Sequence, residues 1–312
     1  MRQLQEIRRD LQFQRDFIQL MEGLHNTALL NYTKIKAVED RYFEEYMKEI
    51  RTFAAFMKTA NITGKFMEQT AGKPCYILIT PDSGLMGGLN NYVVERYFLE
   101  TKDLAETPIT MVLGEKGAQA LEARASIIPF SGYKEAADEI TSKVDQIKES
   151  LFTQIKAGTI NRVGVIYPAS VSFSKQEVRY ERLLPCEDLI EEIKLEIHDP
   201  RRVLIESPGE DFAEYLAAQW LELQLYKVLR DAKLSEHSAR AMHLSTSKEN
   251  LENQLKETED EYRKVRKSLI DKSSREAAAA QQVKKKKDHE TKKRLERKEE
   301  TLALHQVPNS VD

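Results

Sequence analysis

Two long stretches at the ends of this chain carry apolar positions that repeat every seven residues, and this repeat restricts the fold more than any other feature. Residues 2–58 contain no proline and a single glycine, Gly23. A seven-residue repeat keeps one seam of a helix against a partner helix over many turns. The pattern predicts an N-terminal coiled-coil helix over residues 1–58, with these seam positions: Leu4, Ile7, Leu11, Gln14, Ile18, Met21, His25, Ala28, Tyr32 and Ile35.

The second stretch begins after the turn residues Pro208 and Gly209 and contains neither glycine nor proline from residue 211 to residue 280. It predicts a C-terminal coiled-coil helix over residues 210–280, with a seam of the same period: Leu251, Leu255, Thr258, Tyr262, Val265 and Leu269. Each seam alone would leave an apolar stripe in water. We therefore expect the two ends of the chain to pair as an antiparallel coiled coil.

Past residue 280 the repeat gives way to a charged stretch. Residues 281–300 hold nine Lys or Arg and five Asp or Glu, an excess of four positive charges. We expect residues 281–312 to form a basic tail that is either helical or disordered.

The middle of the chain, residues 74–205, has short apolar strands that alternate with helical stretches. Strands are predicted at residues 75–80, 108–114 and 162–170, with an edge strand at 177–185. Helices are predicted at residues 90–103, 115–124 and 133–158. Such alternation favours a mostly parallel sheet. The predicted fold class is α/β: a long antiparallel coiled coil of the N- and C-terminal helices with an inserted small Rossmann-like α/β domain.

The amino-acid composition restricts the kinds of function that this chain is expected to have. Charged residues make up 32% of the chain, which favours long solvated helices, and the net charge of -3 argues against a surface built for nucleic acid. Cys75 and Cys186 match no metal-binding spacing, and so few cysteines favour a reduced cytosolic setting over a secreted disulfide scaffold. The N-terminus lacks the apolar core of a secretory signal, and no apolar run approaches the roughly 20 residues of a membrane span. We therefore expect a cytoplasmic protein without direct membrane insertion.

Three glycines, Gly84, Gly87 and Gly88, stand between an apolar strand and a helix, where phosphate-binding loops occur. A Walker loop has Lys and then Ser or Thr after its last glycine, but here Leu89 and Asn90 follow. The spacing also fails the G-x-G-x-x-G pattern of dinucleotide-binding loops. We predict that these glycines shape the strand-to-helix turn. The chain has no catalytic triad and no His/Cys cluster at recognisable spacing, so no catalytic, cofactor-binding or metal-ligating residue is assigned.

The same loop resembles a signature of the gamma subunit of F-type ATP synthases. The segment TPDSGLMGGLNNYV is similar to the pattern S/T-D-x-G-L-C-G-x-x-N, with Met86 in place of the family's Cys. A second segment, SEHSARAMHLSTSKEN at residues 235–250, resembles the signature of the family's C-terminal helix. The matching positions, which we take as structural or subunit-contact residues, are Met21, Asp82, Gly84, Gly87, Gly88, Asn90, Gln224, Ser235, Glu236, Arg240, Asn250 and Arg266.

This resemblance implies a function as the central stalk of a rotary ATP synthase or ATPase. A gamma subunit is a non-catalytic part of such an enzyme and binds no cofactor itself. It couples ion-driven rotation to nucleotide-site changes in a ring of alpha and beta subunits. The expected partners are alpha- and beta-type subunits, an epsilon-type subunit and the membrane rotor ring, which implies a peripheral location at the inner (cell) membrane.

Two departures from the family pattern leave alternatives open. Glu22 and Gly23 replace the Lys-Met that follows Met21 in the family, and the charged tail replaces an apolar C-terminus. These changes favour, as an alternative, a gamma-like subunit of a specialised F-type-related machine. A second alternative is a coiled-coil scaffold that displays a small ligand-binding α/β domain.

Overall fold

The computed structural model describes residues 4–37, 41–62, 64, 72–82, 84–122, 127–186 and 206–304. It divides into two compact units, which we describe separately. The larger unit is Leu20–Lys248, and the smaller unit combines Met1–Gln19 with Glu249–Asp312.

The larger unit is built around a sheet of five strands in the order β3-β2-β1-β4-β5. The first four are parallel, and β5 pairs with β4 in the antiparallel direction. This confirms the mostly parallel sheet with its edge strand. The strands are β1 (Lys73–Ile79), β2 (Ile109–Leu113), β3 (Ile127–Phe130), β4 (Ile160–Ser172) and β5 (Lys175–Leu184).

Strand β3 is absent from the sequence prediction because it is short and contains Pro129. A proline cannot donate a hydrogen bond to a neighbouring strand, so it argues against a strand in the middle of a sheet. The structure resolves this conflict by placing β3 at the open edge, beside β2.

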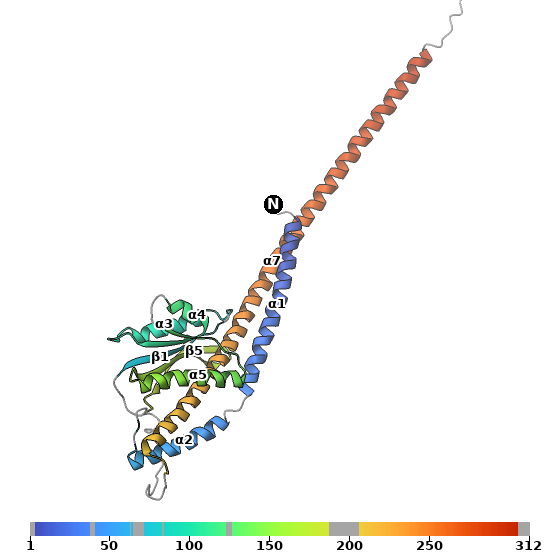
Figure 1. Ribbon diagram of the computed structural model, residues 1–312. Coiled ribbons are helices and arrows are strands. Elements are labelled where there is room, and N and C mark those ends of the chain that lie inside the picture. Colours follow the sequence, from blue (N-terminus) through green and yellow to red (C-terminus); the bar gives the residue numbers. More distant parts are fainter. Residues whose placement is uncertain are drawn as a thin grey trace, which may run out of the picture. The chain divides into compact units, whose positions relative to one another are not determined.

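Helices cover both faces of the sheet, as Figure 1 shows. On one face, α3 (Leu89–Thr101) and α4 (Glu115–Leu121) pack against Tyr76 and Leu78 of β1. On the other face, Cys75, Ile77 and Ile79 join a larger core with α5 (Ala137–Lys156), α2 (Arg41–Ala60) and the first part of α7 (Gly209–Leu304). The alternation along β1 is the two-residue period of a strand buried on both faces.

The N-terminal stretch forms two helices, α1 (Leu4–Ala37) and α2, where the sequence predicted a single one. The heptad seam runs only from Leu4 to Ile35, so it ends where α1 ends. In α2 the buried side chains Met47, Ile50 and Met57 instead belong to the core under the sheet. The separate packing of α2 explains why one straight helix does not continue to residue 58.

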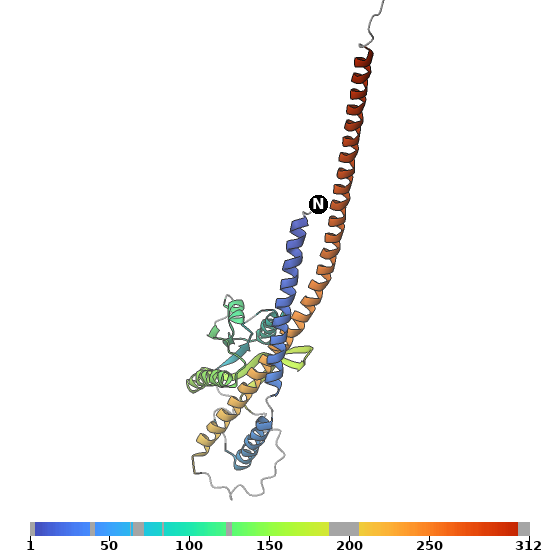
Figure 2. The ribbon, with the colours of Figure 1, turned by 90° about the vertical axis from the view of Figure 1, so that its right-hand side faces the viewer.

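The predicted coiled-coil seam is present along α1 and, on α7, from Leu251 to Val265, where every predicted seam position is partly buried. The last predicted position, Leu269, is wrong, because its side chain is 48% exposed. All ten seam positions of α1 are buried or partly buried, whereas nearly all its other side chains are exposed. Within the larger unit, the ring Nδ1 of His25 lies 3.0 Å from the carbonyl oxygen of Ala241. Within the smaller unit, Gln14 donates to Thr258 over 3.3 Å, and the next residue, Arg15, contacts Glu259 over 2.8 Å. Figure 2 shows these two helices from a second direction.

Helix α7 belongs to both units and extends beyond the predicted residue 280 to Leu304, the last residue that the structure describes. The part of α7 from Phe212 to Leu244 packs into the core with the sheet or beside its loops. The α/β segment and the helices that flank it therefore share one core. The predicted domain limit at residue 205 lies outside the described residues.

Candidate functional site: loops at the sheet edge clasp α7

Three connections at the carboxyl edge of the sheet converge on one stretch of α7. They follow β1, β3 and β4, the third acting through Gln176 at the start of β5, and they contact α7 between Leu229 and Arg240. In open α/β sheets this edge is the usual place for a bound ligand. Here the chain's own helix lies at that edge. We call residues 80–82, 84–88, 131–136 and 173–176, together with α7 residues 229–240, the clasp.

A buried ion cluster lies at the centre of the clasp. Glu236 is only 5% exposed, and its carboxylate contacts Lys233 over 2.7 Å and Arg240 one turn further along α7. Burial alone would raise the pKa of Glu236, but the nearby charges of Lys233 and Arg240 outweigh it and lower that pKa. The carboxylate is therefore ionised and fully compensated, as a buried charge requires.

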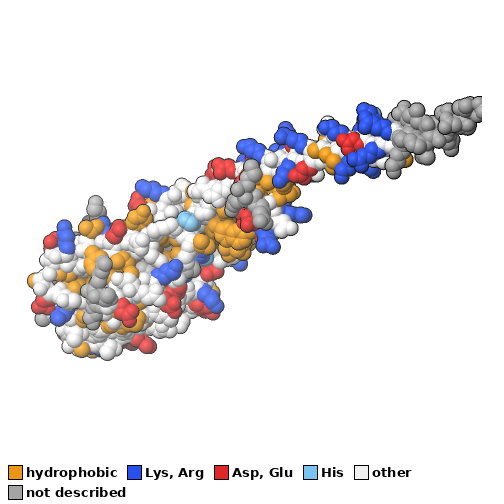
Figure 3. Space-filling model, turned by 90° about the horizontal axis from the view of Figure 1, so that it is seen from above, with side chains coloured by type: hydrophobic (Ala, Val, Ile, Leu, Met, Phe, Trp, Pro, Cys, Tyr) orange, Lys and Arg blue, Asp and Glu red, His pale blue; other side chains and the backbone are white. Residues whose placement is uncertain are grey.

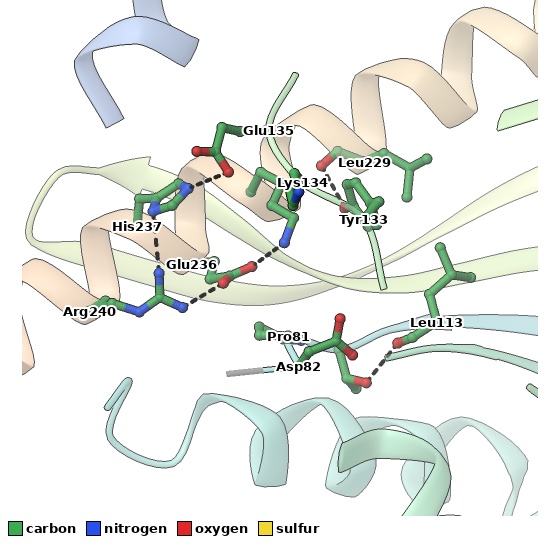
Figure 4. A network of polar contacts seen from close by, with 12 residues as sticks. Pro81, Asp82, Leu113, Tyr133, Lys134, Glu135, Leu229, Glu236, His237 and Arg240 are labelled. Carbon is green, nitrogen blue, oxygen red and sulfur yellow. Dashed lines mark hydrogen bonds and ion pairs between the residues drawn. The ribbon is translucent and has the colours of Figure 1, made fainter. Parts of the chain in front are cut away.

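The connection after β3 contacts this ion cluster through Tyr133. The hydroxyl of Tyr133 donates to the carbonyl of Leu229 over 2.8 Å, and the ammonium of Lys233 lies 4.6 Å from the centre of its ring. Burial, followed by the charges of Glu236 and Asp82, raises the pKa of Tyr133 well above its usual value. The tyrosine is thus a neutral packing and hydrogen-bonding group. Figure 4 shows Tyr133 directed at Leu229, Glu135 directed at His237, and Arg240 between His237 and Glu236.

His237 is held neutral within the same cluster. Its Nδ1 lies 3.4 Å from the Arg240 guanidinium, and its Nε2 lies 3.6 Å from the Glu135 carboxylate, too far for a hydrogen bond. Burial is the largest cause that lowers the pKa of His237; Glu236 and Glu135 oppose it, and Arg240 and Lys233 reinforce it. The ring is a packed, neutral member of the clasp.

Asp82 fixes the connection after β1. Its Oδ1 accepts the backbone N–H of Glu115 over 2.8 Å, which ties the end of β1 to the start of α4. A side-chain carbon at Gly132 would lie 1.3 Å from Oδ2 of Asp82, so the connection after β3 needs glycine at that position. Asn90 adds a hydrogen bond from its amide nitrogen to the carbonyl of Pro81 over 3.2 Å. Asp82 and Asn90 therefore hold loops together.

The glycine loop, residues 84–88, packs against α7. Met86 is buried against Leu89 and Ala239, and its sulfur lies 3.9 Å from the Arg240 guanidinium. Gly87 has a φ of 62°, in the left-handed region that favours glycine. Gly88 immediately precedes α3. The two signature segments, some 150 residues apart in sequence, thus meet through Met86 and Arg240.

The hollow beside this loop does not resemble a phosphate site. Its volume is about 280 Å³, and among the residues that line it only Lys116, near Gly84, is charged. A nucleotide cradle would place a hydroxyl for a metal ion and a lysine directly after the loop. Ser83 lies outside the described residues.

The remaining predicted positions do not all belong to the clasp. Ser235 is fully buried there, and its carbonyl accepts the Ser238 hydroxyl over 3.0 Å. Gln224 contacts the sulfur of Met47 over 3.8 Å, and Met21 is buried on α1. Asn250 and Arg266 belong to the smaller unit and are exposed.

Four residues of the clasp were not predicted from the sequence: Lys233, Tyr133, Gly132 and Glu135. Lys233 had a signal, because it stands three residues before Glu236 and so lies on the same face of a helix. The other three belong to the connection after β3, a strand that the sequence did not reveal.

The described part of the chain contains two buried cysteines and no cluster of metal-ligand side chains. No group of three or more His, Cys, Asp or Glu side chains there is placed to hold a metal ion. Cys75 is buried, which raises the pKa of its thiol to about 12 and leaves it protonated. None of the described helices is both long and apolar enough to cross a bilayer.

Comparisons with known proteins agree with this architecture. A family model described as ATP synthase matches residues 3–273. The ATP synthase gamma chain of Polynucleobacter asymbioticus is 30% identical over 239 residues, which cover 73% of this chain and 81% of that protein. The gamma chain of Chromobacterium violaceum is 26% identical over 252 residues, covering 78% and 86%.

Solved structures share the fold. A chain of the Euglena gracilis mitochondrial ATP synthase rotor superposes with a TM-score of 0.59 at 16% identity, over 86% of this chain and 98% of that chain. A chain from the central stalk and c-ring of the Tetrahymena thermophila enzyme gives 0.51 at 18% identity, over 73% and 99%. At these identities the likeness concerns the fold alone.

Proposed function

Because the chain belongs to the family of ATP synthase gamma chains, we propose that it is the central-stalk subunit of a rotary F-type ATPase. In this role it couples ion-driven rotation to nucleotide-site changes in a ring of alpha- and beta-type subunits. Such a subunit performs no chemistry of its own. It changes the relative stability of its partners' states by making different contacts with each of them.

The clasp is the observation that carries this proposal. A subunit that transmits torque needs its sheet and its long helix to move as one body. In the clasp, the edge of the sheet that would otherwise receive a ligand is bound to α7 by a compensated ion cluster and a buried tyrosine. Packing of this kind is stiff, because cores and buried polar networks have discrete arrangements rather than continuous ones.

We further propose an epsilon-type subunit and a membrane rotor ring as partners, and a peripheral location at the inner (cell) membrane. Support comes from relatives: structures with similar chains are titled as a rotor, as an OSCP/F1/c-ring assembly, and as a central stalk with its c-ring.

The alternative of a gamma-like subunit in a specialised machine has one specific observation in its favour. The family match ends at residue 273, whereas α7 continues to Leu304. A scaffold that presents a ligand-binding α/β domain is disfavoured, because α7 lies at the edge of the sheet where such a ligand would bind.

The proposed function can be tested by co-purification with the partner subunits and by the number of ions pumped per ATP hydrolysed. We expect the full chain, co-expressed with the alpha- and beta-type subunits of its source, to purify with them and to support ATP hydrolysis. Replacing Arg240 with Ala removes the contact with Met86 while Glu236 keeps Lys233. We expect Arg240→Ala to lower ion pumping per ATP hydrolysed several-fold while hydrolysis itself continues.

Two controls make the result interpretable. Lys102→Ala removes an exposed surface cation of the same unit and should leave coupling unchanged. Met86→Ala loosens the same contact from the loop side and should resemble Arg240→Ala. A chain that purifies as a stable monomer, without alpha- or beta-type subunits, would contradict the proposed function.

A further inference from the structure

The C-terminal part of α7 is not buried by any other helix or strand of the chain that the structure describes. From Arg266 to Leu295 every side chain is exposed. The antiparallel pairs Gln14–Thr258 and Arg15–Glu259 place Leu4, the first described residue of α1, opposite about residue 269. We call residues 274–304 the extension. It begins where the match to the family model ends.

The extension has the composition of a helix that forms without tertiary support. Ala277–Ala280 have the highest helix propensity, and Lys, Arg, Glu and Gln supply most of the remaining positions. Neither glycine nor proline interrupts it before residue 305. A helix maintained in this way offers a fixed array of side chains to another molecule.

Positive charge surrounds the extension. Lys284 to Lys287 are consecutive, and successive helix residues point about 100° apart, so these four ammonium groups face four directions. Lys292, Lys293 and Arg294 repeat this two turns later. Figure 3 shows Lys and Arg side chains on both sides of the helix. A partner that uses this charge can therefore approach from more than one side.

The arrangement argues against three kinds of partner. A membrane surface selects an apolar face, but Val283 and Leu295 stand twelve residues apart and so point about 120° away from each other. A second copy of the extension would bring like charges together. Nucleic acid is also disfavoured as a partner, because its phosphates would repel the five carboxylates between residues 281 and 300.

A mixed but predominantly basic helix fits an acid-rich protein surface, where its cations meet carboxylates and its own carboxylates meet scattered cations. We propose that the extension is a docking helix for an acid-rich surface of another subunit in the same ATPase complex, which contacts it on at least two sides. This inference rests on the proposed function, because the partner is taken from that complex.

Zero-length cross-linking tests the proposal in the purified complex. A carbodiimide joins a lysine amine to a carboxylate only when the two are in contact. We expect mass spectrometry to find cross-links from Lys284–Lys287, and from Lys292 or Lys293, to carboxylates of one kind of partner subunit. The yield should fall at high salt, because exposed ion pairs are screened.

Charge variants provide the second readout. We expect Lys284–Lys287→Glu to weaken binding of the full chain to the cross-linked partner subunit about tenfold at low salt and to remove most of the salt dependence of that binding. The matched variant Lys284–Lys287→Arg keeps charge and helix propensity and should bind as the native chain does. A chain that ends at Ser273 should behave like the Glu variant.

The outcomes separate this inference from the proposed function. Failure to co-purify with ATPase subunits would contradict both. Co-purification with cross-links confined to the chain's own carboxylates, and with all four chains bound equally, would overturn the extension proposal alone. So would tight, strongly salt-dependent binding of the native chain to a 30-base-pair DNA duplex that the Glu variant loses, if binding to the partner subunit were unchanged.

Discussion

Two stretches of α7 have similar helix geometry but opposite surroundings. Between Ala213 and Leu244 the helix is embedded in the core of the larger unit, and even its charged residues Lys233 and Glu236 are buried. Between Arg266 and Leu295 every side chain of the helix is exposed. The signature of the family's C-terminal helix lies mainly in the first stretch, whereas the match to the family model ends at residue 273, inside the second.

The contrast shows what restricts a helix sequence. In the buried stretch each polar residue must match specific partners, so Glu236 requires Lys233 and Arg240, and Arg240 also meets Met86. In the exposed stretch the chain itself imposes only helix propensity. Any further restriction there must come from another molecule. The following predictions test this contrast, from the largest expected effect to the smallest.

The largest effect is expected from neutralising the buried carboxylate. Glu236→Gln keeps the shape of the side chain but leaves Lys233 and Arg240 without their compensating charge. Removing one partner from a buried ion cluster costs about 3–5 kcal/mol of unfolding free energy. Urea unfolding of the full chain measures it. The matched control is Glu276→Gln in the exposed stretch, where Lys272 lies 4.0 Å away and the change should stay below about 0.5 kcal/mol. Equal losses of unfolding free energy at residues 236 and 276 would contradict the contrast between the buried and the exposed stretch of α7.

The seam that joins α1 to α7 should give an intermediate effect. Ile7 is 0% exposed in the smaller unit, and Ile7→Ala should cost about 2–3 kcal/mol by leaving a cavity. Because Ile7 lies near the start of α1, we expect the loss to appear as faster amide hydrogen exchange in residues 4–19. Phe13→Ala, at a residue that is 66% exposed, should leave exchange there nearly unchanged. If Phe13→Ala accelerated amide exchange more than Ile7→Ala, the assignment of Ile7 to the buried seam of α1 would be contradicted.

A smaller, pH-dependent effect is expected from His237. Burial lowers its pKa below 6.5, with Arg240 and Lys233 also lowering it and Glu236 and Glu135 opposing them. Between the lowered pKa and 6.5 the unfolded chain binds a proton that the folded chain does not, so stability falls as the pH drops below 6.5. The urea midpoint should decline from pH 7.5 to pH 5 in the native chain. In His237→Asn this decline should be shallower, since the side chain no longer titrates.

Glu236 adds a separate step at lower pH. Its pKa is lowered from 4.5, because the attraction of Lys233 and Arg240 exceeds the effect of burial. The stability that it contributes is complete above 4.5 and is lost as the pH falls through its lowered pKa. This step should be absent from Glu236→Gln, which separates it from the histidine step.

How much of this architecture the sequence predicts depends on the range of the interactions involved. The heptads of α1 and α7 and the period-two strands are local patterns, and they identified the coiled coil, four strands and the mostly parallel sheet. The convergence of Met86 and Tyr133 on α7 depends on how distant segments pack, which no local pattern contains. The family resemblance marked Asp82 and Arg240 as important, but it did not indicate that the loop of Asp82 packs against the helix that carries Arg240. Gly132 carries no recognisable motif, because its role is to leave room for Asp82.

The smallest effect, and the only stabilising one, is expected at Gly23. This residue lies in the middle of α1, and a side-chain carbon there would meet nothing within 4 Å. Gly23→Ala should therefore raise the unfolding free energy by up to about 1 kcal/mol, through helix propensity and a less flexible unfolded chain. Gly87→Ala is the matched contrast, because its φ of 62° makes a side chain costly, although the added carbon would make only an ordinary 3.5 Å contact with the His243 ring. If Gly23→Ala stabilises the isolated chain yet lowers ATP hydrolysis in the complex, the glycine serves the partners rather than the fold. If it destabilises the chain, the exposed face of α1 has a packing role that its surroundings in this structure do not explain.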